Sequence, residues 1–110
     1  MPQPSEILQG TLDMLVLRAA ELGPMHGLGI SDRIRQITHG VFVVKPGSLF
    51  PALQRLEQNG WIGGEWGESE NHRRARFYTL TRSGRAQLAK EKRIWRRAST
   101  AVERLLESEG

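Results

Sequence analysis

The first long segment of the chain, residues 5–22, is more apolar than a helix at the surface of a small domain needs to be. Ser5 is a suitable N-cap residue, and Gly23 followed by Pro24 ends the segment, so one helix is predicted. Its apolar residues lie on more than one side and are Ile7, Leu8, Leu12, Met14, Leu15, Val16, Leu17, Ala19, Ala20 and Leu22. A chain of 110 residues has few elements to surround such a helix. We therefore expect burial by its own core on one side and by a partner subunit on another, the alternative being a central core helix.

Glycine and proline divide the rest of the chain into short segments. A second helix with an apolar stripe is predicted over residues 26–38. Residues 41–44 are β-branched or aromatic, which favours a short strand or an extended segment. A third helix is predicted to start from an N-cap at Gly47 or Ser48, because this start places Pro51 in the first turn, where proline is tolerated.

Two β-prone segments, residues 61–66 and 73–80, flank a polar loop and predict a hairpin. The residues that would share one face of its second arm are Arg74, Arg76, Tyr78 and Leu80. A last helix is predicted over residues 81–107, with Thr81 as its cap.

The last helix carries a seam of the coiled-coil type. Leu88, Trp95 and Val102 are spaced by seven residues, although Glu91 interrupts the seam. A domain this small cannot cover the full length of the helix, so the seam favours self-association over a purely intramolecular contact. The residues expected in a dimer interface are Leu8, Leu12, Leu15, Leu88, Trp95, Ala98, Val102 and Leu105.

The positive charge of the chain is concentrated in one block. Sixteen Lys and Arg residues against twelve Asp and Glu residues give a net charge of +4. Residues 1–60 are neutral, residues 61–72 carry −3, residues 73–97 carry +9 and residues 98–110 carry −2. Most of the block is arginine, whose planar group suits phosphates and guanine edges. The basic residues of the last helix are expected mainly to keep that helix soluble.

Several classes of function lack the residues that they need. The chain has no cysteine, and its three histidines have no metal-binding spacing. The acidic residues near the hairpin lie on a polar loop with no apolar cover to raise a pKa. No catalytic residue, metal site or cofactor is therefore expected, and the chain is not expected to be an enzyme. With no signal peptide and no apolar run that spans a membrane, a cytoplasmic protein is expected.

The order helix, helix, short strand, helix and hairpin is that of a winged helix-turn-helix. This is a mainly α fold with a small β-hairpin wing, of the α+β class. Its third helix enters the major groove of DNA, and the wing follows the backbone or the minor groove. The expected organisation is a DNA-binding domain over residues 5–80 and a C-terminal dimerisation helix over residues 81–107.

Motifs in the right order make the chain resemble the PadR-like transcriptional regulators. They are Leu8-Gln9-Gly10-Thr11-Leu12-Asp13, Gly23 to Ile30, Gly47 to Glu57, Trp61-Ile62, Arg73 to Thr81, and Gly84. The similarity covers about residues 5–90, and the single last helix is similar to the short members, which are dimers. The resemblance implies a dimeric, sequence-specific regulator, with repression and response to a small aromatic ligand near the dimer interface as further expectations. Phe50 departs from the family's usual tyrosine, so a hydroxyl contact to the DNA backbone does not carry over.

The residues expected to contact double-stranded DNA are Lys45, Ser48, Phe50, Gln54, Arg55, Arg73, Arg74 and Arg76. Arg55 and Gln54 are the types that bind guanine and adenine with paired hydrogen bonds. Arg76 has an alternative partner in Glu65 or Glu68 of the opposite hairpin arm. Two other functions stay open: a winged-helix protein-interaction module, and an RNA-binding protein without operator specificity.

Overall fold

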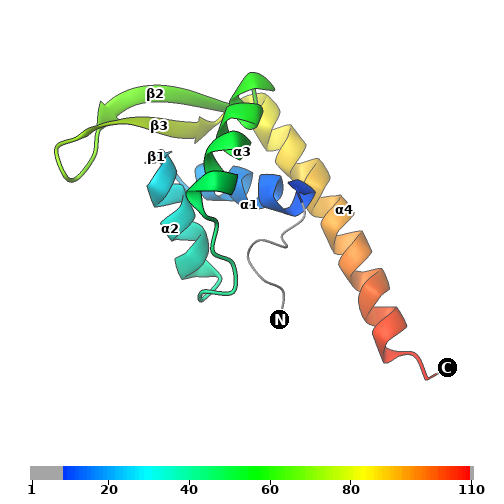
Figure 1. The fold of residues 1–110 in the computed structure, drawn as a ribbon. Coiled ribbons are helices and arrows are strands. Elements are labelled where there is room, and N and C mark those ends of the chain that lie inside the picture. Colours follow the sequence, from blue (N-terminus) through cyan, green and yellow to red (C-terminus); the bar gives the residue numbers. More distant parts are fainter. Residues whose placement is uncertain (1–8, 110) are drawn as a thin grey trace.

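The computed structural model describes residues 9–109 and has the predicted mainly α architecture with a wing (Figure 1). Its elements are α1 (Gln9–Glu21), β1 (Met25–His26), α2 (Gly27–Ile37), α3 (Pro46–Gln58), β2 (Ile62–Glu68), β3 (Arg74–Leu80) and α4 (Arg82–Glu107). The strands form one antiparallel sheet in the order β1-β3-β2. The fold class predicted from the sequence, a winged helix with a C-terminal helix, is confirmed.

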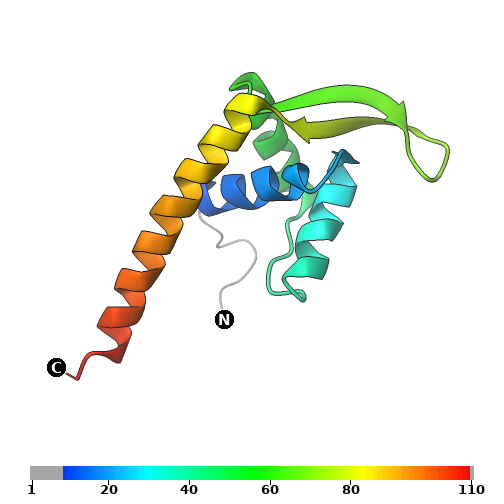
Figure 2. The same ribbon diagram turned by 180° about the vertical axis from the view of Figure 1, so that it is seen from behind.

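Helix α1 is the centre of the domain, with α2, α3, α4 and β3 packed around it (Figures 1 and 2). Val16 and Leu17 are completely buried and join a core that includes Leu53 of α3 and Leu88 of α4. The chain's own elements therefore cover most of α1. The helix is a central core helix, the alternative that the sequence left open beside burial by a partner subunit. Leu22, in contrast, is exposed.

The segment before α3 differs from the expectation. Residues 41–44 form no strand and run irregularly to α3, with the carbonyl of Val44 accepting a hydrogen bond of 2.6 Å from Ser31 Oγ. The strand beside the wing comes instead from Met25 and His26, which pair with Tyr78 and Phe77 of β3. A buried position for Val44 satisfies its apolar side chain without any strand partner.

Helix α3 begins earlier than predicted. Lys45 is the N-cap and Pro46 occupies the first helical position, where its missing N–H costs nothing. The predicted N-cap at Gly47 or Ser48 is therefore wrong, and Pro51 lies in the second turn. The hydrogen bond that Pro51 cannot make would join it to Gly47, and both residues are exposed, so water is available to the free carbonyl.

The hairpin has the predicted alternation. Tyr78 and Leu80 are buried, whereas Thr79 between them is exposed. Residues that face each other across the strands include Trp66 with Arg76 and Glu68 with Arg74. Beyond β1, the two long strands project from the domain as the wing (Figure 1).

Helix α4 starts as predicted and then leaves the domain. Thr81 Oγ1 accepts a hydrogen bond of 3.0 Å from the N–H of Gly84, and the helix ends at Glu107. Gly84 and Leu88 are buried, so the first turns of α4 belong to the core. The rest extends away from the domain on the side opposite the wing, which gives the molecule extents of 58 × 28 × 20 Å (Figure 2). Among residues 9–109, no helix is both long and apolar enough to cross a membrane.

Candidate nucleic-acid interface

The outward face of α3 is polar and carries no acid. Lys45, Ser48, Gln54 and Gln58 are all exposed on it, and Pro51 lies among them. The single acid within α3, Glu57, is turned to the wing and bonded to Arg76. This face is therefore free to approach a polyanion, and its amide and hydroxyl groups are of the type that read base edges.

Phe50 serves partly as a packing residue. Its side chain remains 46% exposed at the edge of the outward face. A Cβ on Gly27 would lie 2.8 Å from Cε1 of Phe50, so the ring rests closely against the first residue of α2. Phe50 therefore packs α3 against the start of α2 while part of its ring stays exposed.

Arg55 differs from its predicted place on the outward face. Its guanidinium donates a hydrogen bond to Oδ1 of Asp13, a carboxylate on α1 whose residue is 8% exposed. The long side chain follows the edge of α3 inward, because a buried carboxylate needs a partner of opposite charge. Arg55 thereby joins α3 to the central helix.

Arg76 is likewise engaged by the protein. Its guanidinium bonds to Glu57 of α3, so the predicted alternative partners Glu65 and Glu68 are wrong. The hydrogen bond that Arg76 donates to Glu57 raises the pKa of Arg76. Burial, followed by the charge of Glu57, raises the pKa of the neighbouring Tyr78 hydroxyl. The outcome is an ion pair that links α3 to the wing.

Arg73 and Arg74 are the exposed cations of the wing. The guanidinium carbon of Arg74 lies 4.6 Å from the centre of the Trp66 ring, and that of Arg76 lies 5.7 Å from it. These are cation–π distances. Trp66 was not among the predicted site residues, although an exposed aromatic facing arginines across a hairpin is a recognisable signal.

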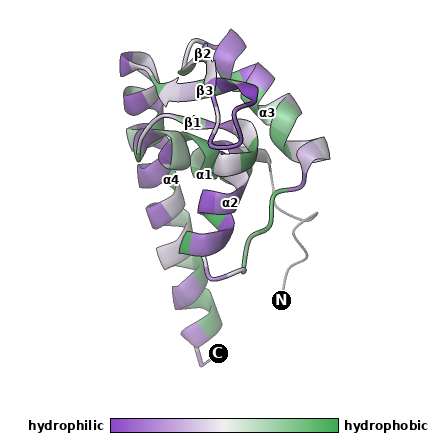
Figure 3. Ribbon diagram, turned by 90° about the vertical axis from the view of Figure 1, so that its left-hand side faces the viewer, coloured by the Kyte–Doolittle hydropathy of each residue, from purple (hydrophilic) through white to green (hydrophobic). Residues whose placement is uncertain are grey.

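The wing tip has a defined turn. The N–H of Ser69 donates to the carbonyl of Arg73 at 2.8 Å, and the N–H of His72 donates back to the carbonyl of Ser69 at 2.9 Å. His72 adopts a φ of +57° and its Nδ1 lies 2.6 Å from Oε1 of Glu68. The loop that joins β2 to β3 is coloured as hydrophilic in Figure 3, and its exposed residues include Glu70, His72 and Arg73.

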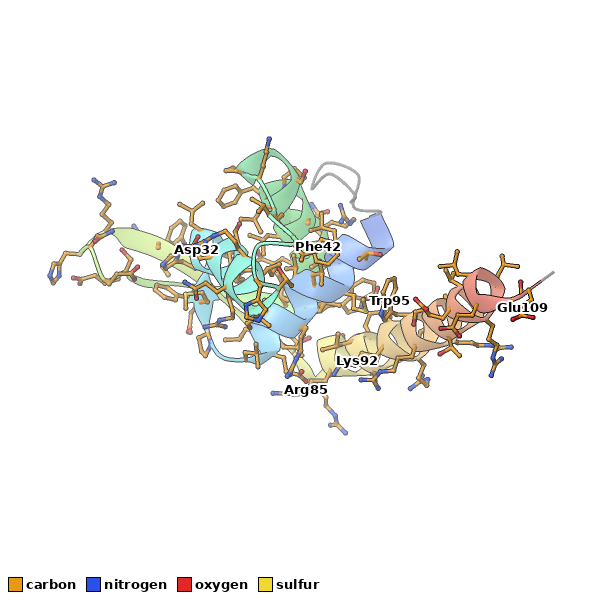
Figure 4. The ribbon with its side chains drawn as sticks, turned by 90° about the horizontal axis from the view of Figure 1, so that it is seen from below. Asp32, Phe42, Arg85, Lys92, Trp95 and Glu109 are labelled. Carbon is orange, nitrogen blue, oxygen red and sulfur yellow. The ribbon has the colours of Figure 1, made fainter. Side chains whose placement is uncertain are left out.

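A second feature is an apolar pocket between α1 and α4. Its volume is about 340 Å³, and its lining residues are Gly10, Thr11, Met14, Glu91, Ile94, Trp95 and Ala98. Trp95 points from α4 to the side on which α1 lies (Figure 4). Burial raises the pKa of the Glu91 carboxyl, and its Oε2 has no hydrogen-bond partner among the described residues. The pocket thus combines aromatic and aliphatic walls with one carboxyl group.

The predicted interface residues fall into four groups. Leu12 and Leu88 are buried in the core of the single chain, so their placement in a dimer interface is corrected. Leu15 is half-buried, and Leu8 lies outside the described residues. The others are exposed along α4 and are Trp95, Ala98, Val102 and Leu105.

Comparisons with known proteins agree with the geometry. The model of the transcriptional regulator PadR-like family matches residues 16–90. A transcriptional regulator of Mycobacterium tuberculosis is 31% identical over 88 residues, which cover 80% of this chain and 78% of that protein. The structure of a transcriptional regulator from Clostridium thermocellum is similar with a TM-score of 0.81, at 27% identity, over 90% of this chain and 96% of that chain.

A PadR-like transcriptional regulator from Bacillus cereus has a TM-score of 0.79 to this chain, at 27% identity. The similarity covers 93% of this chain and 97% of that one. Members of this family are regulators of transcription rather than enzymes. The winged fold, the acid-free face of α3 and these matches together show that the chain belongs to the PadR-like family of transcriptional regulators.

Proposed function

We propose that the protein is a sequence-specific DNA-binding repressor. The observation that carries the proposal is the acid-free outward face of α3, which lies beside a wing that exposes Arg73 and Arg74. Gln54 and Ser48 would contact base edges in the major groove, whereas Lys45 and the wing arginines would contact phosphates. Arg55 and Arg76 would hold α3 in place through Asp13 and Glu57.

The working unit in this proposal is a homodimer formed through α4. Ile94, Trp95, Ala98, Val102 and Leu105 lie within an arc of about 100° on the helix, since successive residues turn by about 100°. Trp95 is 49% exposed and Leu105 is 75% exposed in the single chain. A stripe of this kind on a helix that leaves its own domain needs a cover, and a second α4 offers a matching surface. Two recognition helices related by twofold symmetry would then read two half-sites.

The pocket between α1 and α4 is the proposed effector site. It borders the same stripe of α4, because Ile94, Trp95 and Ala98 line it. A planar aromatic molecule would stack on Trp95, and its binding would change the angle between the two α4 helices of the dimer. Half-site spacing on DNA depends on that angle, so the ligand would release the repressor from its operator.

The experiment that tests the proposal is footprinting of fragments from the promoter region next to the protein's own gene, at several salt concentrations. A short palindromic footprint with an affinity that falls steeply with salt is expected, because each phosphate contact releases counterions. A stable complex with another protein and no footprint at moderate salt would favour the interaction module. Preference for an RNA hairpin of unrelated sequence would favour the RNA-binding function.

A further inference from the structure

His26 joins three parts of the fold through one imidazole ring. Its Nδ1 accepts a hydrogen bond of 3.0 Å from the N–H of Gly29, which makes His26 the N-cap of α2. Its Nε2 lies 3.5 Å from Oε2 of Glu70, on the loop at the wing tip. Its ring meets the Phe77 ring edge to face, with centroids 5.6 Å apart and planes at 79°.

The first two contacts determine where the proton of the ring lies. A nitrogen that accepts a hydrogen bond carries no proton, so the neutral ring holds its proton on Nε2, the nitrogen that lies 3.5 Å from Glu70. A backbone hydrogen bond, followed by the interaction with His26, lowers the pKa of Glu70 below its ordinary 4.5. An ionised carboxylate therefore faces an N–H donor at neutral pH.

The two partners differ in how firmly they are held. The side chain of His26 is 17% exposed and is fixed by β1, α2 and Phe77, whereas that of Glu70 is 76% exposed. β1 pairs with the wing only at Phe77 and Tyr78, close to its base. The contact with Glu70 thus attaches the far loop of the wing to the body of the domain.

We propose that His26 is a positioning residue that ties the wing tip to the N-terminus of α2. The wing would then have its DNA-bound direction before DNA arrives, and less conformational freedom would be lost on binding. This inference rests on the proposed DNA-binding function. The contact between His26 and Glu70, called the tie below, exists in the free protein. It can therefore be tested separately from DNA binding.

Two substitutions separate the tie from the helix cap. His26→Asn keeps an N-cap acceptor but is too short to reach Glu70. Glu70→Gln leaves the cap of α2 intact and removes the charge that faces His26. If His26→Asn does not fold, Glu70→Gln alone still compares the wing tip with and without the tie. Glu65→Gln is the matched control, because Glu65 is an exposed carboxylate on the same wing with no ion-pair partner among residues 9–109.

In the free protein, nitrogen chemical shifts of the His26 ring should report the Nε2–H tautomer. Relaxation of the backbone amides of residues 69–73 should show a more mobile wing tip in each of the two variants, no further change in the double variant, and no change in Glu65→Gln. A proton on Nδ1, or a wing tip equally ordered in all variants, would overturn the tie without any reference to DNA.

Operator binding supplies the second measurement. Removing a negative charge from the wing favours DNA binding in every background, as it should in Glu65→Gln. In the native background, Glu70→Gln also removes the contact with His26, and this loss opposes the gain. In the His26→Asn background that contact is already absent, so nothing opposes the gain. Glu70→Gln should therefore improve affinity about threefold more in the His26→Asn background than in the native one. Equal gains in both backgrounds would contradict the inference, whereas absence of any operator binding by the native protein would contradict the proposed function.

Discussion

Arg55 of α3 donates a hydrogen bond to the carboxylate of Asp13 on the central helix α1. Two residues further along α3, Glu57 bonds to Arg76 of the wing. Helix α3 is thus attached by ion pairs to the core on one side and to the wing on the other. These attachments determine the direction in which its outward face points.

Replacement of Arg55 by methionine should lower the free energy of unfolding by about 1–3 kcal/mol. The substitution keeps an apolar stem of similar size but leaves the Asp13 carboxylate, only 11% exposed, without its partner. Urea unfolding of the two proteins at neutral pH and equal concentration measures the difference.

The Asp13→Asn variant and the double variant complete a thermodynamic cycle for this pair. A favourable coupling energy between Arg55 and Asp13 is expected in the free energy of unfolding. In DNA binding, Arg55→Met is expected to keep the order in which the native protein prefers the bases of its site. If the variant instead kept its stability and lost preference at one base pair, Arg55 would be a base contact.

Gly84→Ala should destabilise the fold by about 1–3 kcal/mol, the usual range for overpacking. A Cβ at Gly84 would overlap the carbonyl oxygen of Trp61 and approach Cδ1 of Leu80 to 2.7 Å. Gly47→Ala is the control, since nothing lies within 4 Å of a Cβ there. Thermal unfolding should show a loss for the first variant and none for the second; equal melting temperatures would mean that α4 can shift away from Trp61 at little cost.

Glu91→Gln should raise stability at pH 7 and flatten its dependence on pH. Burial is the largest cause that raises the pKa of Glu91 above 4.5 in the folded chain, so the folded state binds this proton more tightly than the unfolded state. The stability from Glu91 is therefore complete below about pH 4.5 and is lost as pH rises through the higher folded pKa. Unfolding midpoints between pH 4 and pH 8, with the exposed Glu103→Gln as control, measure the effect. Parallel curves for Glu91→Gln and the native protein would contradict it.

Local signals in the sequence predicted the element ends that depend on a single residue type. Thr81 accepts from the N–H of Gly84 as an N-cap does, and α1 ends at Glu21, just before Gly23 and Pro24. Such signals act within a few residues, so the sequence carries them completely. The two-residue strand of Met25 and His26 has no such signal, because its pairing with β3 is decided by the packing of α2 and the wing.

Two kinds of site residue were harder to predict from the sequence: those with a long side chain, whose contacts lie far along the chain, and those placed by a repeated spacing, whose burial depends on the fold. The position of Arg55 on the helix is at the outer edge, but its side chain reaches Asp13, which is 42 residues away in the sequence. Leu88 shares the seven-residue spacing of Trp95 and Val102 yet is 1% exposed. Spacing along α4 specifies one helix face, and only the fold shows that α1 already covers the beginning of that face.

Gln54→Ala and Arg73→Ala should weaken DNA binding in different ways. Loss of Gln54 should cost about 1–3 kcal/mol on the operator and relax preference at one position, as expected for a base contact. Loss of Arg73 should weaken binding to all sequences alike and reduce the salt slope by about 1, as expected for a phosphate contact. Titrations with operator and unrelated duplexes at several salt concentrations distinguish the two. An identical pattern in both variants would mean that the face of α3 does not read bases.

Trp95→Ala should shift the protein from dimer to monomer in sedimentation at micromolar concentration. The ring is half exposed in the single chain and lies in the middle of the apolar stripe of α4, where a large aromatic side chain contributes much interface area. Trp66→Ala is the matched control, because Trp66 is also an exposed tryptophan but lies on the wing, at the other end of the molecule from the tip of α4. The control should stay dimeric and lose affinity for DNA through the arginines that it orients, whereas Trp95→Ala should lose affinity in proportion to the monomer formed. A dimer that persists in Trp95→Ala would move the interface away from α4, to the surface around Leu22, which follows the end of α1 and is 46% exposed.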